Sequence, residues 1–238
     1  MVQRILIALA AAAAIAATVA LGFWQLGRAH QKVALQAAIE ARGGGAPVDV
    51  RQLLAGPDAE AAIVHRPVVL HGRWVADRTV FLDNRQMDGR QGFYVVTPLA
   101  LEGRQAAILV QRGWVPRNFE DRTALPPVET PAGVVEVRGR LAPPPAKLFD
   151  FGGEEHGPIR QNLDLKRFRA ETGLPLLGLS VQQAGPASEG LLRQWPQAGS
   201  GADTNYGYAF QWWAIATLIA ILYVWFQFVR PRRQARRP

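Results

Sequence analysis

Aromatic and polar side chains that could hold a flat, amphipathic ligand lie where two apolar segments meet polar sequence. Trp24, Gln25 and Arg28 follow the first segment, while Tyr208 and Trp212 open the second. If both segments are helices and pack side by side, these groups converge at one membrane face. Aromatic rings would contact an apolar ring system and Arg28 would pair with carboxylates, as a porphyrin requires. The alternative is that the aromatic residues are interfacial anchors and that Arg28 extends its head group to water.

Other residue types offer little chemistry. The four histidines are not spaced as a zinc site, and the absence of cysteine excludes disulfides and thiolate metal sites. Three serines occur without a nucleophile elbow, and no phosphate-binding glycine loop is present. We therefore predict that the protein is not an enzyme and holds no metal through its own ligand cluster. His30 lies within two turns of the predicted membrane surface. We expect it to be a solvated helix residue, and an iron ligand is the alternative.

Two segments have the length and composition of membrane spans. Residues 5–23 form a run of 19 without a charge, and residues 208–229 carry tryptophan near both ends. A cleaved signal peptide is the alternative for the first segment. The predicted organisation is a cytoplasmic N-terminus at 1–4, spans at 5–23 and 208–229, an extracytoplasmic domain at 24–207 and a basic cytoplasmic tail at 230–238.

The charge distribution predicts the topology. The formal net charge is +8, and five arginines lie in the last nine residues, directly after the second apolar segment. Their position indicates a membrane surface and argues against nucleic acid. Both termini are then cytoplasmic and the domain between the spans is periplasmic. No Arg- and Ser-rich presequence precedes the first span, which favours a bacterial inner (plasma) membrane over a mitochondrial one.

The region between the spans reads as a helical stalk followed by a β-rich domain. The composition of residues 28–42 favours helix, and from Val68 onward short runs rich in Val, Ile, Phe and Trp alternate with turns. Residues 85–92 are expected to form a long polar hairpin loop, and residues 102–105 a tighter one. A strand over 158–163, a short helix over 164–172 and a strand over 176–183 complete the pattern. The predicted fold class is therefore a membrane protein in which two transmembrane helices flank one mainly antiparallel α+β domain, a small barrel or sandwich.

Three ordered blocks resemble the SURF1 (Surfeit locus 1) family. They are LGFWQLGRAHQK after the first span, FLDNRQMDGRQGFYVVTPL with ILVQRGWVPR in the centre, and NYGYAFQWWAIA at the second span. The resemblance implies two transmembrane helices around an extracytoplasmic domain and a role in building haem–copper cytochrome c oxidase. It also implies association with haem a during its delivery to the catalytic subunit. The positions that carry over are Trp24, Gln25, Arg28, Tyr208 and Trp212.

One position departs from the family pattern. Members commonly have a histidine three residues before the tyrosine that corresponds to Tyr208, whereas this chain has Asn205 there. A histidine would be a natural axial haem ligand. Haem binding here therefore either uses another residue, of which His30 and Tyr206 are the nearest, or does not occur. In the second case the protein is a scaffold that binds oxidase subunits or other assembly factors. An extracytoplasmic enzyme is the third alternative, without a supporting motif.

Overall fold

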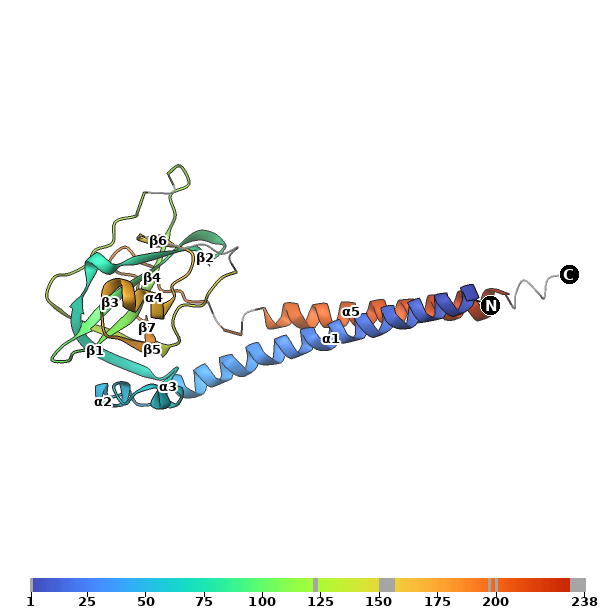
Figure 1. Ribbon diagram of the computed structural model, residues 1–238, viewed down its shortest axis with the longest axis horizontal. Coiled ribbons are helices and arrows are strands. Elements are labelled where there is room, and N and C mark those ends of the chain that lie inside the picture. Colours follow the sequence, from blue (N-terminus) through green and yellow to red (C-terminus); the bar gives the residue numbers. More distant parts are fainter. Residues whose placement is uncertain (1, 122–123, 150–156, 197, 200, 232–238) are drawn as a thin grey trace. The chain divides into compact units, whose positions relative to one another are not determined.

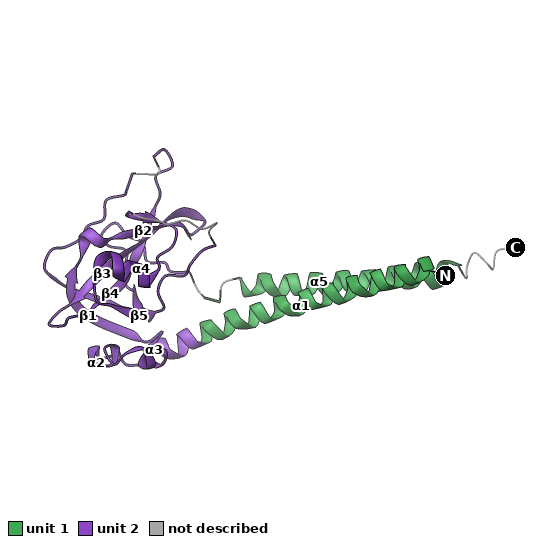
Figure 2. Ribbon diagram, viewed as in Figure 1, with its two compact units in different colours: residues 1–37, 197–238 green, residues 38–196 purple. Residues whose placement is uncertain are grey.

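The computed structural model describes residues 2–121, 124–149, 157–196, 198–199 and 201–231 (Figure 1). Two compact units make up the chain: residues 1–37 with 197–238, and residues 38–196 (Figure 2). We call them the helix pair and the barrel unit. His156, Ser200 and the arginines after residue 231 lie outside the described residues.

The helix pair consists of two long apolar helices. Helix α1 spans Val2–Gly43, and helix α5 spans Ala202–Val224 and continues as the π-helical turn η2, Trp225–Val229. Both are long and apolar enough to cross a membrane. The two predicted spans lie within them, and α1 runs on without a break through the predicted stalk to the glycines that begin at Gly43.

The barrel unit is built on five strands that close on themselves. Their order is β1 (Pro67–Trp74), β5 (Val134–Ala142), β7 (Leu176–Gln183), β4 (Ala107–Pro116) and β3 (Arg90–Leu101), and β3 pairs with β1 again. Strand β2 (Val80–Met87) extends the sheet beyond β3, followed by the short β6 (Ile159–Arg160). All pairings are antiparallel except β4 with β7 and β2 with β6. The predicted fold class is thus confirmed, with a barrel rather than a sandwich.

Close approach of backbones allows the barrel to close. Gly72 is opposite Leu101 in the β1–β3 pairing, and a Cβ atom on Gly72 would overlap the carbonyl oxygen of Ala100. Any larger residue would therefore push β1 away from β3. Strand β4 is buried at nine consecutive positions because the barrel interior covers one face and helix α4 (Leu165–Thr172) and loops cover the other. Its near-continuous run of apolar residues follows from this double burial.

Short helices complete the barrel unit. Helices α2 (Val50–Leu53) and α3 (Pro57–Ile63) precede β1, and the 3₁₀ turn η1 (Ala76–Arg78) precedes β2. Helix α4 matches the predicted short helix: the Asp164 side chain accepts a hydrogen bond from the Arg167 amide, and Gly173 ends the helix with positive φ.

Two local predictions were wrong. Residues 85–92 do not form a long loop, because β2 and β3 continue to a two-residue turn at Asp88 and Gly89. Both turn residues have positive φ, as a type I′ turn requires, and Asp-Gly adopts it readily. The strand expected at 158–163 shrinks to β6, because the Asn162 side chain bonds the backbone of Leu148 in place of a ladder partner.

Candidate functional site

Small and polar residues form the contact between α1 and α5. The buried residues are Gly22 and Ala29 on α1 and Ala202, Ala209 and Ala216 on α5. All are spaced by seven, as in a close-packed seam of two supercoiled helices. Within this seam the Asn205 amide donates to Gln25 Oε1 at 2.6 Å, while Asn205 Oδ1 is buried without a partner. The residue at the family's histidine position thus lies in the helix contact.

Aromatic contacts mark one side of the seam. The rings of Phe23 and Trp213 meet edge to face at 5.5 Å, and those of His30 and Tyr206 at 6.2 Å. These four residues form what we call the His30 face. Trp213 also covers Gly22, where a Cβ would overlap its indole.

The remaining predicted residues gather on the other side. Trp24 and Arg28 are four residues apart on α1, as Tyr208 and Trp212 are on α5, so each pair shares a helix face. Helix periodicity places both pairs on the opposite side of the seam from the His30 face. The Gln25–Asn205 bond puts them at the same level along the two helices. We call this group of four the Trp24 face.

The Trp24 face is open and has the groups that a flat anionic ligand needs. Trp24 is 58% exposed and Tyr208 48% exposed, whereas Trp212 is half-buried. Arg28 is exposed and donates to Gln31 at 3.4 Å. Aromatic surface and an exposed guanidinium therefore fit the ring and carboxylates of a porphyrin. The axial ligand does not fit: His30 is the one histidine in the sequence of this unit, and it lies on the other face.

The family-like blocks of the barrel unit meet in a buried polar network that sequence reasoning did not assign. Asp83 and Asn84 interrupt the β2–β3 register, and Asn84 has positive φ. This bulge turns Arg85 inward, where it is 6% exposed and donates to the Gln161 carbonyl oxygen at 2.9 Å. Burial lowers the pKa of Arg85 and raises that of the neighbouring Tyr94. The arrangement ties the β2 bulge to the segment that follows β6.

Arg112 is a second buried arginine whose role the sequence did not reveal. Its side chain is fully buried, 4.6 Å from the Trp74 ring, and it donates to Glu189 at 3.0 Å and Thr130 at 2.8 Å. Arg193 also pairs with Glu189 and donates to the Arg112 carbonyl oxygen. The signal available in the sequence was an arginine next to Gln111 inside a largely apolar strand.

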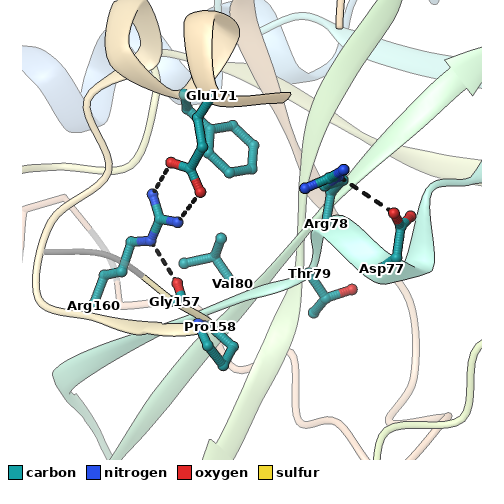
Figure 3. A pocket seen from close by; sticks show the side chains of 9 residues that line it. Asp77, Arg78, Thr79, Val80, Gly157, Pro158, Arg160 and Glu171 are labelled. Atoms are coloured by element: carbon teal, nitrogen blue, oxygen red, sulfur yellow. Dashed lines mark hydrogen bonds and ion pairs between the residues drawn. The ribbon is translucent and has the colours of Figure 1, made fainter. Parts of the chain in front are cut away.

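A pocket of about 270 Å³ lies between β2, β6 and α4 (Figure 3). Arg160 fills one side: it forms two bonds to the Glu171 carboxylate and one to the Gly157 carbonyl oxygen. Across the pocket, Arg78 pairs with Asp77. The volume is below the ~300–1,000 Å³ usual for ligand pockets, and these charges already have partners. The Arg160–Glu171 pair therefore links β6 to α4, and we assign no ligand to this pocket.

Within the described residues, no three His, Asp or Glu side chains gather closely enough to hold a metal ion. The residue types at the Trp24 face are therefore the strongest basis for a ligand site. Their role in binding stays a prediction.

The chain is similar in sequence to known proteins. The profile of the SURF1 family matches residues 12–217. The chain is similar to the cytochrome oxidase assembly protein SHY1 of Saccharomyces cerevisiae, 28% identical over 95 residues, which are 40% of this chain and 24% of the yeast protein. It is also 27% identical over 99 residues to a SURF1-like protein of Rickettsia felis, covering 40% of each chain. The matched segments thus span less than half of either relative. The family profile, in contrast, runs from the first apolar helix through the barrel to the second, and the chain belongs to the SURF1 family.

Proposed function

We propose that this protein is an assembly factor for haem–copper cytochrome c oxidase, anchored in a bacterial inner membrane by α1 and α5. Both termini face the cytoplasm, and the barrel unit faces the periplasm, where it contacts the catalytic subunit or other assembly factors. Family membership and the name of the yeast relative support the oxidase role. The arginines after α5 support the orientation.

The Trp24 face is the surface proposed to hold haem a before its transfer to the catalytic subunit. The single observation that carries this proposal is that helix periodicity brings Trp24, Arg28, Tyr208 and Trp212 to one open side of the seam at one level. Haem would supply the redox centre of the oxidase. The residues here would bind its ring and carboxylates without covalent chemistry, so we propose no catalytic step.

A scaffold that holds no haem is the second candidate function. The location of His30 favours it: this histidine contacts Tyr206 on the opposite face, and Asn205 is engaged with Gln25 in the seam. His30 is therefore not on the Trp24 face to ligate iron, and the Asn205 amide group is held by Gln25. In the scaffold case the barrel unit alone would bind oxidase subunits.

The visible spectrum decides between the two functions. The protein would be purified in mild detergent after co-expression with the enzymes of haem a synthesis. On the haem-holding proposal, a haem a band is present and is lost in Arg28→Ala but kept in His30→Ala, because the two residues lie on opposite faces. Arg4→Ala, at the far end of α1, is the matched control and keeps the band.

Two other outcomes would redirect the proposal. A band that depends on His30 and not on Arg28 would move the site to the His30 face. A colourless protein that still co-purifies oxidase subunits would establish the scaffold. Asn205→His then asks whether restoring the family histidine is sufficient for haem binding.

A further inference from the structure

A group of basic side chains in the barrel unit has no place in the function proposed above. Arg42, His65, Arg66 and Arg140, which we call the basic cluster, lie where the end of α1, the α3–β1 turn and β5 meet. The His65 amide donates to the Leu141 carbonyl oxygen at 2.8 Å, and the Leu141 amide donates to that of Arg66 at 2.9 Å. These bonds hold the turn against the end of β5.

Two members of the basic cluster are occupied in holding the backbone. Arg42 Nη1 donates to the carbonyl oxygens of Ala61 and Val64, at 3.1 and 3.2 Å, and so caps the end of α3. Arg66 Nη2 donates to the Ala46 carbonyl oxygen at 2.9 Å. Both positive charges therefore stay in place beside the turn.

The other two members have buried nitrogen atoms without partners. Arg140 gives one amino group to Gln182, whereas its Nη1 is buried and unpaired, and so is His65 Nδ1. A buried guanidinium N–H without an acceptor is unfavourable and rare in folded proteins. Unpaired buried nitrogen atoms also occur on Arg85, Arg112 and Arg117. The two atoms of this cluster differ in that their residues are joined through the His65–Leu141 backbone bond, and this proximity suggests a shared acceptor.

His65 is held in this position by an unusual backbone conformation. Its φ is 71°, in the left-handed region that few non-glycine residues adopt. Burial lowers the pKa of His65, and the nearby charges of Arg140 and Arg42 lower it further. Strained backbone and unpaired donors beside fixed positive charge are a combination found at ligand sites.

We propose that the basic cluster binds the phosphate group of a soluble compound, with Arg140 Nη1 and His65 Nδ1 as donors. A phosphate accepts hydrogen bonds from several directions, and its two charges are balanced by cationic neighbours. Lipid headgroups carry the same group. However, α1 continues for 19 residues from Phe23 to Arg42, about 28 Å of helix at ~1.5 Å per residue, which favours a soluble source.

Calorimetric titration of the full-length protein in neutral detergent tests the proposal, with inorganic phosphate as the probe. We expect saturable binding with a Kd of about 1 mM or tighter. Arg140→Gln and His65→Gly should each weaken it about tenfold or more, because each removes one donor. His71→Ala is the matched control: this exposed histidine pairs with Glu136 and should bind phosphate as the unmodified protein does.

The His65→Gly variant keeps the test valid if Arg140→Gln fails to fold, because glycine adopts positive φ without strain. Absence of phosphate binding, or equal binding in His65→Gly and the unmodified protein, would overturn the proposal. A second arm uses nanodiscs of phosphatidylcholine with or without phosphatidylglycerol. If the protein binds no free phosphate, and Arg140→Gln weakens binding only to nanodiscs with phosphatidylglycerol, the ligand is a lipid headgroup and the proposal of a soluble compound is wrong.

Discussion

Arg112 in the barrel unit and Gly22 in the helix pair are both buried, yet they exclude water in opposite ways. Around Arg112, polar and aromatic partners gather: Glu189, Thr130 and the Trp74 ring surround one guanidinium, and Arg193 shares the Glu189 carboxylate. Around Gly22 there is no side chain to match, and the Trp213 indole occupies the space that a side chain would take. One region is specified by polar partners and the other by shape.

The difference follows from the surroundings of each unit. Apolar burial drives a barrel to fold in water, and any charge buried with it must be paired. Two apolar helices in a bilayer gain nothing from leaving lipid, so close contact of small residues and an occasional polar bond such as Gln25–Asn205 hold them together. The same physical reasoning therefore predicts different sensitive residues in the two units.

The largest effect is expected in the barrel unit. Arg112→Ala leaves Glu189 partly buried beside Arg193 alone, and should reduce the free energy of unfolding by about 3–5 kcal/mol. Arg138→Ala is the control, because Arg138 is 74% exposed in its pair with Glu136 and should matter by about 0–1 kcal/mol. Denaturant titration of the full chain in detergent measures both. Equal losses in the two variants would mean that pairing does not specify the barrel.

An intermediate effect is expected in the helix pair. Gly22→Leu forces Trp213 out of the seam and should destabilise the α1–α5 contact by about 1–3 kcal/mol. Gly27→Leu adds the same side chain where nothing lies within 4 Å, and should change little. Hydrogen exchange of the α5 amides reports the contact in both variants. If α5 is as protected in Gly22→Leu as in Gly27→Leu, shape does not specify the pair.

The smallest effect tests a surface charge at the start of α4. The hydrogen bond from Lys147, followed by the Arg167 amide, lowers the pKa of Asp164 from 3.8 to about 2. Because the folded pKa lies below the unfolded one, this charge stabilises the fold above about pH 4 and stops doing so as the pH falls through about 2. Asp164→Asn keeps an oxygen for the helix cap but removes the charge. The variant should be less stable at pH 6 by under about 1 kcal/mol, since the Asp164 side chain is 46% exposed.

The matching measurement compares denaturation midpoints of the two proteins at pH 6 and near pH 2. The difference should disappear at the lower pH. A difference that stays constant would assign the effect to the cap rather than to the charge.

Local sequence was sufficient for most elements of the barrel unit. Short runs rich in Val, Ile, Phe and Trp predicted a β-rich region from Val68, the strand predicted over 176–183 is β7, and the helix predicted over 164–172 is α4. The hairpin tip was mispredicted because polar residues on an exposed hairpin look like a loop, although Asp88-Gly89 was the available signal. The parallel β4–β7 pairing and the closure at Gly72 depend on strands far apart in the chain, so no local pattern reports them.

The sequence by itself determined two apolar helices, a β-rich domain between them and the residue types that stand where the helices leave their apolar runs. Only the tertiary structure decided which of those residues share a face. Trp24, Arg28, Tyr208 and Trp212 lie on one side of the seam and His30 on the other, because the side on which a helical residue lies depends on which of its neighbours contact the partner helix. The contact is set by small residues, Gly22 and Ala29 on α1 and Ala209 and Ala216 on α5, which allow the two helices to approach closely. The sequence of either helix alone does not show which residues of the other helix they contact.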